Sequence, residues 1–131
     1  MIPNTLTTAP LVTISIESQY LIQQSDPAQA HYVFSYTVTI HNESDEEVQL
    51  LGRHWIITDG DDLSTEEVHG DGVIGVQPKI KPNESYCYTS GSIMHSPVGT
   101  MHGSYRMITS QKQAFDVEIK AFTLATEHQL H

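Results

Sequence analysis

Three glycines, Gly70, Gly72 and Gly75, stand in the pattern G-x-G-x-x-G, with which dinucleotide-binding proteins hold a pyrophosphate at the start of a helix. The surrounding residues argue against that use. Pro78 would fall within the first turns of the helix, and Asp71 would place a carboxylate beside the phosphates. The sequence therefore predicts that the glycines form a structural turn between strands, and that the chain uses no cofactor.

Metal-ligating residues are numerous but poorly spaced for a metal site. None of the six histidines between residues 31 and 102 forms the H-x-H or H-x-x-x-H pair that is typical of zinc sites. Asp59, Asp61 and Asp62 slightly resemble a calcium-binding loop, but Leu63 interrupts the alternation and the glycine required at the sixth position is absent. The sequence predicts no defined metal centre and leaves these three aspartates as weak cation candidates.

Hydrolytic machinery is not predicted either. The segment Thr89-Ser90-Gly91-Ser92 does not match the nucleophile elbow G-x-S-x-G. The carboxylates Glu66 and Glu67 are neighbours in sequence, so a strand would point them to opposite faces, where they could not work as an acid/base pair. We expect that the chain is not an enzyme.

The charge of the chain restricts its partners. Six lysines and arginines against 16 aspartates and glutamates give a net charge of −10, and the cations are scattered. Binding of nucleic acid or of an anionic bilayer relies on clustered cations and is therefore disfavoured. A basic protein or a cation would be a more natural partner.

The same composition indicates one cytoplasmic domain. A length of 131 residues suits a single domain, for which we expect a core over about residues 12–125 and flexible ends. The first residues hold no secretory signal, and no apolar run approaches the roughly 20 residues that a membrane helix needs. The single cysteine, Cys87, expected as a half-buried strand residue, cannot form an intrachain disulfide, which fits a reducing compartment.

The elements that must position these residues are strands. Apolar and polar residues alternate with a period of two, over residues 12–17, 32–40, 101–107 and 115–120. Turn signals separate these segments, among them residues 42–47, Asp59-Gly60 and Pro82-Asn83. One apolar and one polar face per strand is what an antiparallel sheet packed on a second sheet requires. The sequence predicts an all-β, two-sheet antiparallel sandwich.

One strand breaks this alternation. Leu50 and Trp55 fall on opposite parities, although both are core candidates. A β-bulge at Gly52-Arg53 would bring both into the core, and glycine tolerates a bulge. We therefore expect Trp55 inside and His54 outside.

Several longer segments together resemble the bacterial ApaG family, also labelled CorD. The resemblance covers about residues 12 to 125 and rests on residues 32–40, 48–55, 70–78, 86–91 and 97–105. It implies an immunoglobulin-like or fibronectin type III-like sandwich, and a use as an interaction module, with an indirect link to cobalt and magnesium homeostasis. It supplies no catalytic residues. One departure is Asn83, where the family turn commonly reads Pro-Gly-Glu, and asparagine is a fair substitute at a left-handed position.

Two functions remain open. The first is a non-catalytic protein-interaction module with an unidentified protein partner, and the alternative is a regulatory protein that binds a small ligand or a divalent cation. For the first, residues 73–77 look like an apolar edge strand ending at Pro78, beside an acidic hairpin that could steer a basic partner. An ordinary buried strand beside a solvated hairpin would show the same pattern. The interaction candidates are Asp61, Asp62, Glu66, Glu67, Asp71, Val73 and Ile74.

Overall fold

Strands account for most of residues 10–60 and 63–126, which are the residues that this computed structural model describes. The strands are β1 (Val12–Tyr20), β2 (Tyr32–Asn42), β3 (Val48–Asp59), β4 (Thr65–Asp71), β5 (Lys79–Ile80), β6 (Ser85–Met94), β7 (Val98–Thr109) and β8 (Ala114–Ala125). Two short 3-10 turns, η1 (Ile22–Gln24) and η2 (Pro27–Gln29), connect β1 to β2. The predicted turn at residues 42–47 separates β2 from β3, and Asn83 adopts the expected left-handed conformation with a φ of 66°.

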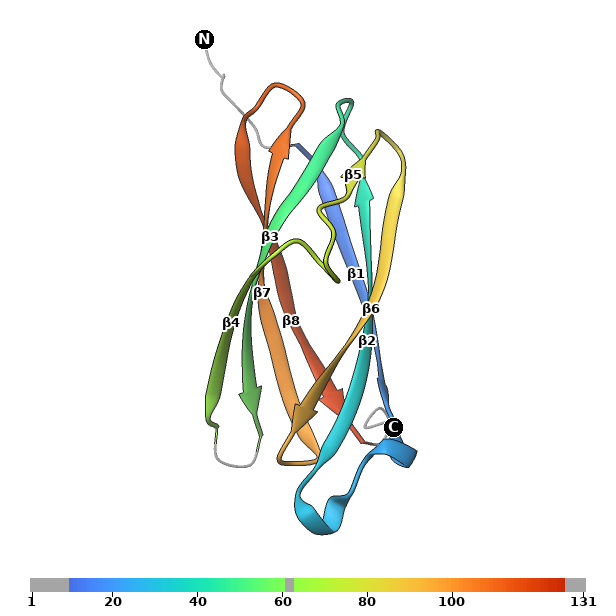
Figure 1. Cartoon of the computed structure of the whole chain (residues 1–131), viewed down its shortest axis with the longest axis vertical. Helices are drawn as coiled ribbons and strands as arrows, with labels where there is room; N and C mark the ends of the chain where they lie inside the picture. The colour runs from blue at the N-terminus through green and yellow to red at the C-terminus, as the bar shows by residue number, and fades with distance from the viewer. Residues whose placement is uncertain (1–9, 61–62, 127–131) are drawn as a thin grey trace.

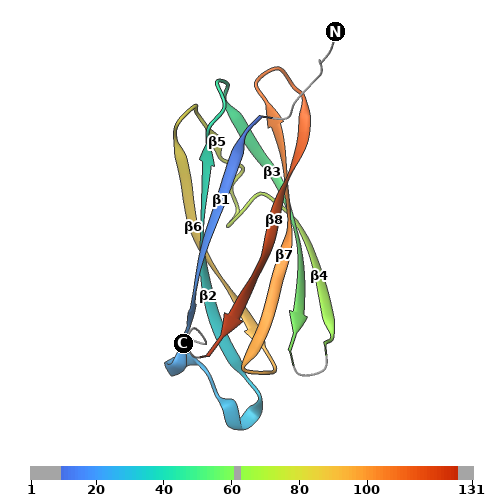
Figure 2. The same ribbon diagram turned by 180° about the vertical axis from the view of Figure 1, so that it is seen from behind.

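The strands form two antiparallel sheets that face each other (Figure 1, and from behind Figure 2). One sheet has the order β1-β2-β6, and the other has the order β4-β3-β7-β8, with the short β5 also paired to β3. This arrangement confirms the predicted all-β, two-sheet antiparallel sandwich. Among the strands of residues 10–60 and 63–126, β4 lies at one edge of the larger sheet and is paired to β3 alone.

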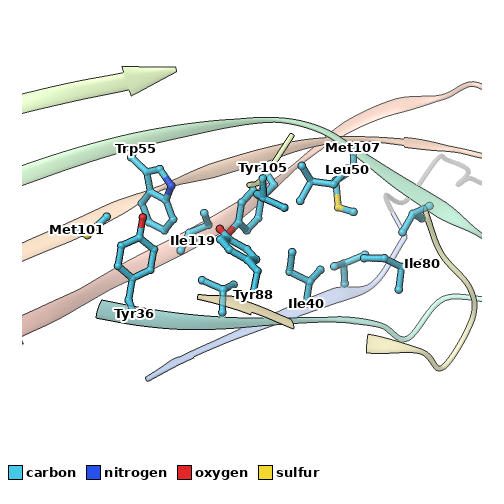
Figure 3. Close-up of a cluster of buried hydrophobic side chains, with 14 of the residues drawn as sticks. Tyr36, Ile40, Leu50, Trp55, Ile80, Tyr88, Met101, Tyr105, Met107 and Ile119 are labelled. Atoms are coloured by element: carbon cyan, nitrogen blue, oxygen red, sulfur yellow. The ribbon is translucent and has the colours of Figure 1, made fainter. Parts of the chain in front are cut away.

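The space between the sheets holds the core (Figure 3). Strand β2 shows the alternation most clearly, because Phe34, Tyr36, Val38 and Ile40 are buried while the residues between them are half-buried on the outer side. The larger sheet buries side chains of β3, β7 and β8 in this core, among them Leu50, Trp55, Met101, Tyr105, Met107 and Ile119. Cys87 lies in a strand as predicted, but it is exposed on the outer face and not half-buried.

The predicted bulge exists, one residue earlier than expected. Leu50 pairs with Met107 and Gly52 pairs with Arg106, so Leu51 is the extra residue in β3. An extra residue reverses which side chains face inward beyond it. Trp55 accordingly lies in the core with 2% of its surface exposed, and its ring contacts Tyr36 at a centroid distance of 5.5 Å.

Two tyrosines from opposite sheets meet in the middle of the core. The hydroxyl of Tyr88 on β6 is hydrogen-bonded to the hydroxyl of Tyr105 on β7. Burial raises the pKa of Tyr88 to about 12 and also raises the pKa of Tyr105. One hydroxyl donates to the other where water is excluded, which lets two polar groups stay in an apolar core.

The expected loose ends fall mainly on residues 1–9 and 127–131, which lie outside the described residues. Within residues 10–60 and 63–126, the helical segments lack the length and apolar character that a membrane crossing requires.

Replacing the core indole tests the inward position of β3. Trp55→Ala should lower the free energy of unfolding by about 3–5 kcal/mol, because it leaves a large cavity between the sheets. Urea denaturation measures the loss, and Ile93→Ala, at a residue that is 54% exposed, is the control that should change stability by less than about 0.5 kcal/mol. The native protein should show blue-shifted tryptophan fluorescence. A solvent-like native spectrum would contradict the burial of Trp55.

The tyrosine pair predicts a loss of stability at alkaline pH. A phenol whose pKa is about 12 in the folded state and about 10 in the unfolded state stabilises the fold fully below pH 10. That contribution, about 3 kcal/mol for Tyr88, is lost as the pH rises from 10 to 12. The double variant Tyr88→Phe/Tyr105→Phe should lose less stability over this range, as measured by urea denaturation at each pH. Parallel pH profiles for the two proteins would refute this account.

Candidate functional site

The hairpin of β3 and β4 brings together side chains that the sequence separates. Its pairing runs from Thr58 opposite Thr65 to Gly52 opposite Asp71, and it places His54 directly opposite His69. The backbone N–H of Asp59 donates to the carbonyl of Ser64 at one end of the ladder. Hydrogen-bonded and non-hydrogen-bonded pairs alternate from there, so the histidines occupy a non-hydrogen-bonded pair, in which Cα atoms are only about 4.5 Å apart.

The two imidazoles share one carboxylate on the outer face of the sheet. Glu67 precedes His69 by two residues and therefore projects to the same side of β4. Its Oε2 lies 2.5 Å from Nε2 of His54 and 3.2 Å from Nε2 of His69. The two rings stack with a centroid distance of 4.1 Å and an interplanar angle of 7°. We call these three residues the His-Glu-His cluster.

The two histidines alter the acidity of the carboxylate between them. Hydrogen bonds from His54 and then from His69 hold the pKa of Glu67 below its usual value. The carboxylate is therefore ionised at neutral pH. Its side chain is 58% exposed, and those of His54 and His69 are 33% and 68% exposed, so solvent reaches all three groups.

Beside the cluster, the outer face of the larger sheet is hollowed into a groove of about 580 Å³. The groove contains both histidines of the cluster, and its wall on the β7–β8 side carries the ion pair of Arg106 with Asp116, at 3.5 Å. It is lined by Gly52, Arg53, His54, His69, Gly70, Asp71, Ser104, Arg106 and Asp116.

The glycine motif forms a turn, as predicted, and not the start of a helix. Gly72 has a φ of 61°, and a Cβ there would lie 2.1 Å from the carbonyl oxygen of Val76. Gly75 has a φ of 77° and follows Ile74, whose φ is 47°. Two successive residues with positive φ make a tight two-residue turn, closed by hydrogen bonds in both directions between Val73 and Val76.

This turn corrects the prediction of an apolar edge strand at residues 73–77. Val73 is fully buried and cannot belong to an interaction surface, whereas Ile74 is 61% exposed at the tip of the turn. The edge strand of this region is β4 instead, and its Glu66, Glu67 and Asp71 are exposed.

The first glycine of the motif, Gly70, makes room for an arginine. A Cβ on Gly70 would lie 2.6 Å from the guanidinium carbon of Arg53. That guanidinium donates from Nη1 to the carbonyl of Asp71 at 3.2 Å and to the carbonyl of Gly72 at 2.9 Å. Arg53 therefore holds the end of β4 by hydrogen bonds to its backbone carbonyls. Its guanidinium lies where the phosphates would lie if this motif bound a dinucleotide.

Of the three aspartates predicted as weak cation candidates, only Asp59 lies among the described residues, and its carboxylate is already engaged. Asp59 is buried, and its carboxylate accepts hydrogen bonds from the backbone N–H of His95 at 2.7 Å and from the hydroxyl of Ser96 at 2.5 Å. It joins the β3–β4 loop to the β6–β7 turn. Asp61 and Asp62 lie outside the described residues.

The His-Glu-His cluster was not predicted from the sequence. Histidine-pair spacing does not reveal Glu67-x-His69, because the second histidine, His54, comes from the neighbouring strand. The sequence predicts a tight turn at Asp59-Gly60, but Asp59 still belongs to β3 and the connection between the strands runs from residue 60 to 64. A loop of that length is the signal that would have placed His54 opposite His69.

Comparison with known proteins gives consistent results. Residues 22–109 match the family model described as the ApaG domain. The protein ApaG of Thiobacillus denitrificans is 48% identical over 120 residues, covering 92% of this chain and 94% of the relative. The protein ApaG of Salmonella arizonae is 49% identical over 123 residues, covering 94% and 98%. A crystal structure of a Bordetella pertussis protein, named as an ApaA protein, superposes with a TM-score of 0.89 at 42% identity, covering 92% of this chain and 97% of the other.

Two glycine substitutions test the turn. Gly72→Val should destabilise the fold by at least about 2–3 kcal/mol, because a β-branched residue resists positive φ and its Cβ would clash with the backbone of Val76. The matched control is Gly75→Ala, where no other atom lies within 4 Å and only the strain of positive φ remains, about 1 kcal/mol. Thermal or urea denaturation compares them. Equal effects of the two substitutions would contradict this assignment.

Proposed function

The chain belongs to the ApaG family, and we propose that it works there as a non-catalytic protein-interaction module that binds an extended segment of its partner along the edge of β4. The observation that carries this proposal is the unpaired side of β4. An extended peptide can add to such an edge as a further strand, with main-chain hydrogen bonds supplying affinity.

The register of the hairpin identifies the groups that a partner strand would meet. Ser64 is hydrogen-bonded to β3, and so is Gly72, whose N–H donates to the carbonyl of Leu51. Along β4, every second residue between Ser64 and Gly72 is hydrogen-bonded to β3. The N–H and C=O groups of the four residues in between are therefore directed away from β3, and these residues are Thr65, Glu67, His69 and Asp71. A partner strand would therefore find a ladder of donors and acceptors along β4, except at the carbonyl of Asp71, which already accepts a hydrogen bond from Arg53.

Exposed apolar side chains stand at both ends of this edge. Leu63, just before β4, is 72% exposed, and Ile74 and Val76, in the turn after it, are 61% and 46% exposed. Large apolar side chains at the ends of an open edge provide contacts that a partner would bury. They would also help to define the length of the bound segment.

Charge selects the kind of partner. Glu66, Glu67 and Asp71 give the edge an acidic character, and the chain as a whole carries a net charge of −10. Charged edge residues disfavour pairing between two copies of the same chain, because like charges repel. A basic segment is the complementary occupant, and nucleic acid is disfavoured. We place this interaction in the cytoplasm, with any link to cobalt or magnesium homeostasis running through the partner.

The alternative function, binding of a small ligand or a divalent cation, has one specific support. This is the His-Glu-His cluster, in which two imidazoles converge on a carboxylate. The two functions are compatible, because the cluster uses side chains on the outer face whereas strand addition uses the backbone of β4.

A proline at the edge tests the proposed function. Thr65→Pro removes a donor from the open side of β4 without removing a hydrogen bond to β3, and proline is tolerated as the first residue of a strand. It should weaken retention of a partner captured from native cell lysate by at least about tenfold, whereas the control Thr65→Ala should not. Retention is measured by quantitative mass spectrometry.

Charge reversal gives an independent measurement on the same edge. Glu66→Lys/Asp71→Lys should slow association, and the effect should shrink at high salt, because exposed charges are screened over about 10 Å at 0.1 M. A partner that binds equally well to the proline and charge-reversal variants would reject β4 as its site.

A further inference from the structure

The geometry of the His-Glu-His cluster differs from that of an ordinary surface ion pair. An ion pair needs one histidine for one carboxylate, but here Nε2 atoms from two strands are directed at the same oxygen of Glu67. The three potential ligand atoms all lie within 4.8 Å of one another. In a tetrahedral metal site with bonds of about 2.0–2.2 Å, ligand atoms are roughly 3.3 Å apart. Side-chain movements on the order of 1 Å, together with a tilt of the two stacked rings that directs both in-plane Nε2 lone pairs at one point, would bring the three atoms to coordination distance of one ion.

The backbone already restrains the three side chains. His54 and His69 belong to the close, non-hydrogen-bonded type of cross-strand pair, and Glu67 lies on the same face of β4. A metal would therefore not have to assemble its ligands from mobile loops. The stacked rings keep both nitrogens on one side of the hairpin.

The donor set determines the class of metal. Two imidazole nitrogens and one carboxylate oxygen suit Zn²⁺, Ni²⁺ and Cu²⁺, whereas Mg²⁺ and Ca²⁺ prefer oxygen ligands. The exposure of His69 and Glu67, 68% and 58%, gives an ion access and leaves part of its coordination shell open to water. Three protein ligands with an open position describe an accessible site and not a closed structural one.

We propose that His54, Glu67 and His69 form a binding site for a divalent transition-metal ion such as Zn²⁺, coordinated through both Nε2 atoms and one carboxylate oxygen of Glu67. The site is independent of the proposed strand addition, because it uses no backbone group of β4.

Titration of the apo full-length chain with Zn²⁺, followed by ¹H–¹⁵N NMR, tests the site. Saturable, one-to-one shifts should appear at residues 54, 67 and 69. His69→Gln and Glu67→Gln should each weaken this binding by at least 10–100-fold, the loss that even supporting residues around a metal cause. Both variants keep a polar side chain of similar size, and an unchanged spectrum elsewhere shows that they are folded.

The control is His102→Gln, which removes an exposed histidine on β7 outside the cluster and should leave the affinity unchanged. Three results would overturn the proposal: shifts confined to other histidines, an affinity unaltered in both cluster variants, or an equal response to Mg²⁺. Because Thr65→Pro leaves the three ligands in place, it should still bind Zn²⁺. Failure of strand addition and failure of metal binding are thus observed separately.

Discussion

One extra residue in β3 determines what lies on each face of the larger sheet. Side chains alternate along a strand, so without the bulge at Leu51 the strand that buries Leu50 would turn His54 inward and Trp55 outward. The bulge reverses this. The indole packs edge-on against Tyr36, Tyr105 and Phe122, and the imidazole emerges on the outer face beside β4. Core packing and the exposed cluster are therefore consequences of the same local irregularity.

Much of this arrangement could be predicted because it depends on local pattern. The alternation in β2 and the broken parity between Leu50 and Trp55 together required two packed sheets and a bulge near Gly52. The observed bulge is displaced by one residue, at Leu51, because glycine allows an irregularity nearby without fixing its position. The fold was therefore accessible from periodicity, and the inward position of Trp55 followed from it.

What could not be predicted depends on register and on unusual backbone. If Asp59-Gly60 were a two-residue turn, His54 would face residue 65, and the cluster would not form. Residues 73–77 were mistaken for a strand because their apolar residues suggest one. Ile74 nevertheless adopts a positive φ, which β-branched residues rarely do, and the neighbouring Gly75 completes the turn. The length of the β3–β4 loop and the positive φ of Ile74 depend on the surrounding structure, so the residue types alone do not predict them.

The residues that first suggested chemistry serve to anchor β4. At one end, Asp59 ties the hairpin loop to the β6–β7 turn, and at the other end Gly70 and Gly72 allow Arg53 to hold the backbone. An edge strand with a neighbour on one side only would otherwise fray readily. Because its ends are fixed from within, the middle of β4 can remain open, with its backbone unpaired on one side and Glu67 and His69 accessible. The groups that anchor this strand are buried or hydrogen-bonded, whereas Glu67, an interaction candidate from the sequence, and His69, which no motif identifies, are exposed.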